Sequence, residues 1–198
     1  MTTRSLSSAR LTRAARSTLA RSTSPSTKIL RETAYHEAGR AAISLRYGFD
    51  AKVCTCSEDG FSWGGCVSEY PTRRARPTKL HSIYQAMAGQ LAEVILEQLD
   101  DGYDLNDAAA DAHYGTKMLA DAIAHDEMFK FDMRAAGIDP ESDGWYAEVH
   151  QVKTVLRMLM AEWPRVVRVA EILIQQATNR AMAVVEVYAD GEISLPSH

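Results

Sequence analysis

The fold of this chain of 198 residues is organised around the stretch TAYHEAGR at residues 33–40. We expect this stretch to lie inside a first helix that runs from about residue 28 to residue 47. Gly48 is placed to end that helix, because glycine readily adopts the left-handed conformation that follows a helix end. Within such a helix His36 and Arg40, four residues apart, lie on the same face.

The same stretch is one residue short of the pattern H-E-x-x-H. In that pattern two histidines on one helical face bind a single Zn²⁺, and the glutamate polarises a metal-bound water. His36 and Glu37 occupy the positions of the first ligand and the general base, but Arg40 occupies that of the second histidine. A guanidinium is permanently charged and has no lone pair to give to a metal. We therefore expect a zinc site that is lost or strongly altered.

Composition predicts one globular domain. Hydrophobic residues make up 46% of the chain, which is enough for one core, and no stretch approaches the roughly 20 apolar residues that span a bilayer. The cysteines are odd in number (Cys54, Cys56 and Cys66), which favours a reducing compartment over a disulfide framework. Their C-x-C spacing is weak as a zinc signal, and small buried hydrophobic residues would show the same pattern.

Charge divides the chain into a basic arm and an acidic body. Seven of the 22 basic residues lie in residues 1–31, which contain no acid, although the net charge is -4. We assign residues 1–27 to an arm or targeting segment outside the fold and residues 28–198 to the domain. We expect a cytoplasmic protein, with the mitochondrial matrix as the alternative if the arm is a transit peptide.

Periodicity in the body predicts a mainly α fold with one small β-hairpin. The expected hairpin has strands at 51–56 and 61–70. Expected helices follow at about 78–100, 104–125, 143–162 and 164–180, with a looser segment around Phe129 to Met133. Residues 184–188 and 193–195 favour a second hairpin, although a continued helix is the alternative.

Four motifs resemble, in order, the FtsH-type (membrane AAA) zinc metallopeptidases. The segments WPRVV at 163–167 and AEIL at 170–173 resemble the closing helices of short, stand-alone relatives, so the resemblance covers roughly residues 32–180. The stretch AYHEAG at 34–39 is similar to that family's AYHEAGH, and WGGCV at 63–67 falls where the family has a glycine-bearing β segment. AGQLAE at 88–93 is similar to AGRxAE, and DLNDA at 104–108 is similar to DLxxA. The resemblance implies a helical peptidase-like domain that acts on polypeptides.

The resemblance also implies a third zinc ligand, the aspartate that opens the DLxxA segment. This would be Asp104, with Asp107 as the runner-up because the register of this acid-rich run is uncertain. Arg40 would then replace the charge of the metal by pairing with Asp104 or Glu37. None of His81, His113, His125 and His150 has the spacing to replace the missing ligand, and each is expected to be an ordinary histidine.

Three functions follow from these observations. The first is a pseudopeptidase that serves as a binding module, and the second is an active zinc endopeptidase with His36 and Asp104 as ligands and Glu37 as the base. The third is a structural or assembly protein whose basic arm contacts nucleic acid or another anionic partner, although no nucleic-acid motif supports it. Zinc is the expected cofactor only if the protein is active. The chain has no Gly-x-x-x-x-Gly-Lys-Ser/Thr motif, so any motor would be a separate ATPase; a homo-oligomer is possible.

Overall fold

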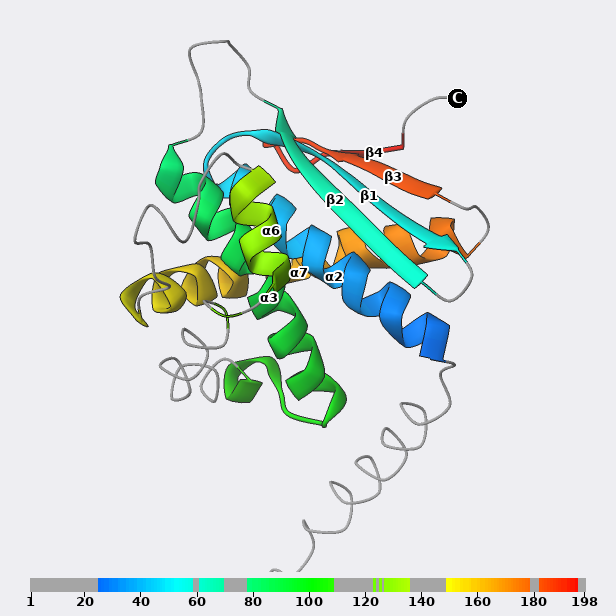
Figure 1. Cartoon of the computed structure of the whole chain (residues 1–198), viewed down its shortest axis with the longest axis horizontal. Coiled ribbons are helices and arrows are strands. Elements are labelled where there is room, and N and C mark those ends of the chain that lie inside the picture. Colours follow the sequence, from blue (N-terminus) through cyan, green and yellow to red (C-terminus); the bar gives the residue numbers. More distant parts are fainter. Residues whose placement is uncertain are drawn as a thin grey trace, which may run out of the picture.

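The computed structural model describes residues 25–58, 61–69, 78–108, 123, 125, 127–135, 149–178 and 182–195. Helices lie beneath one face of a small sheet (Figure 1). In chain order the elements are α2 (Pro25–Arg46), β1 (Asp50–Glu58), β2 (Phe61–Glu69), α3 (Lys79–Asp100), α6 (Glu127–Ala135), α7 (Val149–Ala177), β3 (Met182–Val187) and β4 (Ile193–Ser194). This confirms the prediction of a mainly α fold with a small β element. The predicted arm falls largely outside the described residues.

The sheet has four antiparallel strands in the order β2-β1-β3-β4. The predicted hairpin is confirmed as β1 and β2, which pair from Asp50 with Glu69 to Glu58 with Phe61. The C-terminal hairpin is confirmed as β3 and β4, and the alternative of a continued helix is wrong. The two hairpins form one sheet because β3 also pairs with β1, a contact between segments far apart in the sequence.

The inner face of the sheet packs against the helices. The outer face, on the opposite side, does not contact α2. Residues on the inner face are buried, among them Val53 on β1, Cys66 on β2 and Val185 on β3. Alternation along the strands places Cys54 and Cys56 on the outer face. The three cysteines therefore do not converge, and all are free thiols.

Both long N-terminal helices end where glycine permits a left-handed residue. Gly48 has φ 77° and Gly102 has φ 94°. After α2 the amide of Gly48 donates to the carbonyl of Leu45 (2.9 Å), and the amide of Phe49 donates to the carbonyl of Ser44 (3.0 Å). These are the two hydrogen bonds of a Schellman motif, which satisfies carbonyls that the helix leaves free. The predicted end of the first helix is thus confirmed.

Helix α7 corrects the prediction of two separate helices. It runs for 29 residues through Pro164, which we had expected to start a new helix. Proline inside a helix removes one hydrogen bond and costs about 3 kcal/mol. Pro164 itself is exposed, while residues on both sides, such as Leu159 and Val166, are buried in the same core. Packing outweighs the local cost of the proline.

Two further predictions concern the region between α3 and α7. The looser segment expected around Phe129 is wrong, because α6 is a helix there and Phe129 and Met133, four residues apart, are both buried. The helix expected at 104–125 is present at residues 105–108, and most of its remainder lies outside the described residues. Among the described helices none combines the length and the apolar character needed to cross a membrane.

His81 is a buried polar residue near the start of α3. It is 1% exposed, and its ring meets those of Tyr47 and Phe49 edge-on at centroid distances of 4.9 and 5.2 Å. Neither ring nitrogen has a hydrogen-bond partner among the described residues. Burial lowers the pKa of His81 below its ordinary value of 6.5, because the charged imidazolium loses its hydration.

This burial predicts a pH dependence of stability. The unfolded chain protonates His81 more readily than the folded protein, so the free energy of unfolding should fall as the pH drops below about 6.5. We expect His81→Phe, which keeps an aromatic ring against Tyr47 and Phe49, to reduce this fall in urea titrations between pH 7.5 and 5. His150→Gln, at an exposed histidine, is the control and should leave the fall unchanged. Equal slopes for His81→Phe and the wild type would contradict the assignment.

Candidate functional site

His36 lies in the interior where α2 crosses α3. It is 5% exposed, and its Nδ1 lies 2.6 Å from Oε1 of Glu93 on α3. A carboxylate accepts hydrogen bonds, so Nδ1 is the donor in this pair. Metal-binding histidines in proteins are usually oriented in this way by a second carboxylate.

Small residues make this contact possible. A Cβ atom on Gly39 would lie 2.7 Å from the carbonyl oxygen of Ala88, and one on Gly89 would lie 2.3 Å from Nε2 of His36. The Gly89 position would also be 2.5 Å from Cε1 and 2.6 Å from Cδ2. These nearly equal distances place the Cβ over the face of the imidazole rather than along its lone pair. Gly89 therefore packs against the face of the His36 imidazole, where a larger residue would overlap the ring.

Glu37 lies between α2 and the inner face of the sheet. It is 4% exposed, and a Cβ on Gly64 of β2 would come within 2.5 Å of its Cγ. One turn further along α2, Nη1 of Arg40 lies 3.3 Å from Oε2 of Glu37. The side chains of Glu37 and Arg40 are only 5% and 13% exposed, so the two charges face each other in a poorly solvated environment.

Arg40 therefore points into the protein, toward the residue expected to be the general base. Of the two partners predicted for it, the structure gives Glu37. The guanidinium supplies a positive charge beside the carboxylate, where the family pattern would have a metal ion. As a buried ion pair, each group offsets part of the desolvation cost of the other.

A polar cluster continues from this pair between α2, α3 and β2. Ser44 and Ser68 share a hydrogen bond of 2.7 Å, and Nε2 of Gln85 donates to both hydroxyls at 3.0 and 3.1 Å. The same amide lies 3.5 Å from the sulfur of Cys66. Burial raises the pKa of the Cys66 thiol to about 12, although the positive charge of Arg40 acts in the opposite direction. Cys66 is therefore a thiol at neutral pH and not a thiolate ligand.

The aspartates predicted as zinc ligands are exposed. Asp104 caps the start of a short helical turn, where its Oδ1 accepts a hydrogen bond of 2.9 Å from the amide of Asp107. Both side chains are exposed, whereas His36 is buried. Of the histidines considered as replacement ligands, His81 is buried elsewhere in the core, His125 and His150 are exposed, and His113 lies outside the described residues.

The donor set does not fit a zinc ion. Within the part of the chain that the structure describes, no three His, Cys, Asp or Glu residues form a group that could hold a metal. At the predicted centre His36 offers one imidazole nitrogen, and Arg40 neutralises Glu37.

Two site residues were missed by sequence reasoning. Glu93 is inside the AGQLAE motif but had no assigned role, and Gln85 was not considered. The signal for Glu93 was its place one helical turn after Gly89, which allows both residues to contact the same histidine. Nothing in the sequence singled out Gln85.

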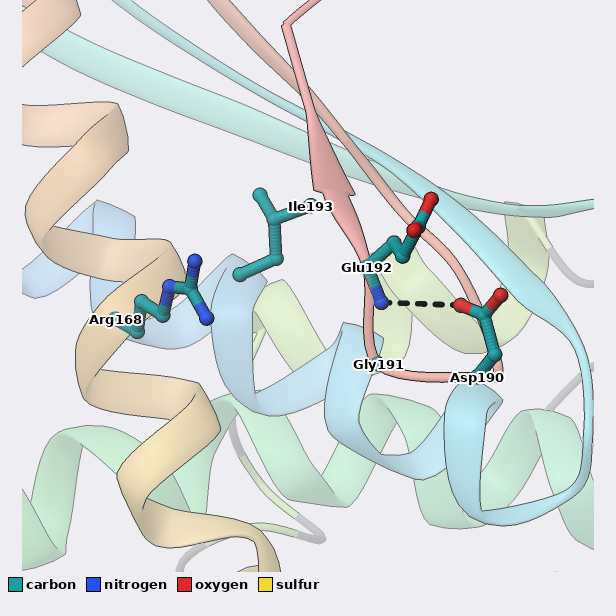
Figure 2. A pocket seen from close by; sticks show the side chains of 5 residues that line it. All are labelled: Arg168, Asp190, Gly191, Glu192 and Ile193. Carbon is teal, nitrogen blue, oxygen red and sulfur yellow. Dashed lines mark hydrogen bonds between the residues drawn. The ribbon is translucent and has the colours of Figure 1, made fainter.

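A surface hollow lies elsewhere, between α7 and the β3–β4 turn (Figure 2). It is lined by Arg168, Asp190, Gly191, Glu192 and Ile193, none of which belongs to the predicted site. Asp190 accepts a hydrogen bond of 3.0 Å from the amide of Glu192, and Gly191 has φ 98°. These features stabilise the turn itself and indicate no ligand.

Comparison with family models, with curated proteins and with solved structures gives no significant match. The resemblance to the FtsH-type peptidases therefore depends on the residue motifs alone.

The first prediction for the site concerns the buried ion pair of Arg40 and Glu37. Arg40→Met should lower the free energy of unfolding by about 3–5 kcal/mol, because it removes the cation that faces the buried Glu37 carboxylate at 3.3 Å. Arg165→Met is the matched control, since Arg165 pairs with Glu162 at the same helical spacing but is 31% exposed. It should cost at most about 1 kcal/mol. Similar losses in urea titrations of the two variants would show that burial does not distinguish the pairs.

Adjacent glycines on β2 give a second prediction. Gly64→Ala should lower the free energy of unfolding by about 1–3 kcal/mol, because the new methyl group would overlap Cγ of Glu37. At Gly65 a Cβ would meet only the sulfur of Cys54 at 3.5 Å, an ordinary contact. Gly65→Ala should therefore stay within about 1 kcal/mol of the wild type. Thermal or urea unfolding of both variants tests the close approach of Glu37 to the sheet.

Proposed function

We propose that this protein is a pseudopeptidase of the FtsH type that has lost its zinc and serves as a binding module for polypeptides. In this proposal Arg40 takes over the charge of the metal and holds Glu37 in place. The observation that carries it is the buried contact of 3.3 Å between Arg40 and Glu37. The order of the four motifs along the chain supports the choice of family.

Loss of hydrolysis follows from the chemistry of these residues. A general base in this position has to accept a proton from water, and a guanidinium beside the carboxylate weakens it as a base by stabilising its ionised form. Arg40 cannot replace the second histidine, because it has no lone pair with which to bind a cation. On this proposal the chain keeps the helices of the family and the small residues between them, and so it keeps a fold suited to binding.

An active zinc endopeptidase is the second candidate. The hydrogen bond of 2.6 Å from His36 to Glu93 favours it, because metal-binding histidines are usually oriented by a carboxylate in this way. In this alternative His36 and Asp104 bind zinc, Glu37 is the general base, and a further ligand is required. The exposure of Asp104 on the described surface counts against it.

Metal content and proteolysis separate the two candidates. We expect the wild type to purify with well under one equivalent of zinc and to leave casein intact. Arg40→His should raise zinc occupancy severalfold, since it restores a second imidazole one turn from His36. Arg40→Lys keeps the positive charge and is the matched control, which should bind no more zinc than the wild type. Stoichiometric zinc together with casein cleavage by the wild type would overturn the proposal.

A further inference from the structure

The two edges of the sheet differ. One edge is β4, which is only the two residues Ile193–Ser194. The other is β2, which spans Phe61–Glu69 and pairs, among the described strands, with β1 alone. Figure 1 shows β2 as the outermost strand on its side of the sheet. A long edge strand presents a row of backbone amides and carbonyls that can pair with another strand.

Strand β2 lacks the features that usually protect an edge. Its sequence, FSWGGCVSE, contains no proline and no lysine, and its one charged residue is Glu69 at the end. Every residue from 61 to 69 has a single partner on β1, so no bulge interrupts the strand. Natural proteins commonly use prolines, lysines and bulges to prevent pairing at an edge. The edge is therefore suited to pairing.

The outer face beside this edge exposes large apolar side chains. Trp63 is 54% exposed and Val67 is 64% exposed, and both project from β2. Trp63 continues a row across the sheet through Cys56 to Met182, which is 50% exposed. Large exposed hydrophobic residues that gather in this way mark interaction surfaces more often than scattered ones do.

Strand β2 is complementary to a second copy of itself. Residues that face each other across an antiparallel pair must project from the same side of the sheet, which leaves only every second register. Among these, the register centred on Gly65 pairs all nine residues, with Phe61 opposite Glu69. It also places Trp63 of each copy opposite Val67 of the other on the outer face. Aromatic and β-branched residues form favourable cross-strand pairs.

We propose that the protein forms a homodimer through antiparallel pairing of β2 with β2 of a second copy, about a two-fold axis at Gly65. The four-stranded sheets would then become one continuous sheet. An isologous two-fold contact is the commonest form of self-association. One nine-residue strand from each copy, with Trp63 and Val67, is a small contact of the kind found in weak or transient complexes, so we expect a dissociation constant on the order of micromolar. This inference does not depend on the proposed function.

Charge substitutions at the facing pair test the register. Sedimentation velocity of the full chain from about 1 to 200 μM should show a concentration-dependent dimer for the wild type. Trp63→Lys with Val67→Lys places like charges opposite each other and should weaken the dimer at least tenfold. Trp63→Lys with Val67→Glu removes the same apolar side chains but places opposite charges together, so it should dimerise more tightly than the first double variant. Positions 63 and 67 are exposed, so circular dichroism should show both variants folded.

Met182→Lys is the matched control, because Met182 is equally exposed on the outer face but lies on β3, away from the edge. It should dimerise like the wild type. The proposal is overturned if the wild type is a monomer throughout the range, even if it then binds an extended peptide at β2. It is also overturned if the two double variants dimerise equally well, or if Met182→Lys alone abolishes the dimer.

Discussion

The close approach of α2 to α3 is the constraint on which the site depends. Gly39 and Gly89 have no Cβ atoms at the two points where one would overlap Ala88 or His36. Two larger residues would push the helices apart, because protein interiors are too densely packed to absorb such an overlap. The distance of 2.6 Å between His36 and Glu93 exists only because these backbones can meet.

Electrostatics then decides what the centre can do. The sheet covers Glu37 from one side through Gly64, so its carboxylate has little access to water. A buried carboxylate needs a cation nearby, and Arg40 provides one from the next turn of the same helix. A metal ion exchanges with solution, whereas a guanidinium is part of the chain. On the proposed function this difference turns a reactive centre into a fixed structural one.

Sequence patterns predicted the local elements well and the interruptions poorly. The amphipathic stripe of α3 and the alternation in β1 and β2 are regular, so their type and approximate bounds could be read directly. Pro164 led to a false break because its cost is local, whereas the burial that offsets it comes from the core on both sides. Around Phe129 the apolar residues were too few to show a period, yet two of them are buried four residues apart in α6.

The sequence by itself determined the helix that carries His36 and Glu37, its end at Gly48, and the absence of a second imidazole at position 40. These features depend on residue type and on neighbours within one or two helical turns, both of which can be read directly from the sequence. Only the tertiary structure decided that Arg40 contacts Glu37, that Glu93 orients His36, and that β3 joins β1 and leaves β2 at the edge. Such contacts join residues of separate elements that lie a few ångströms apart. Small residues between the elements set how closely they can pack.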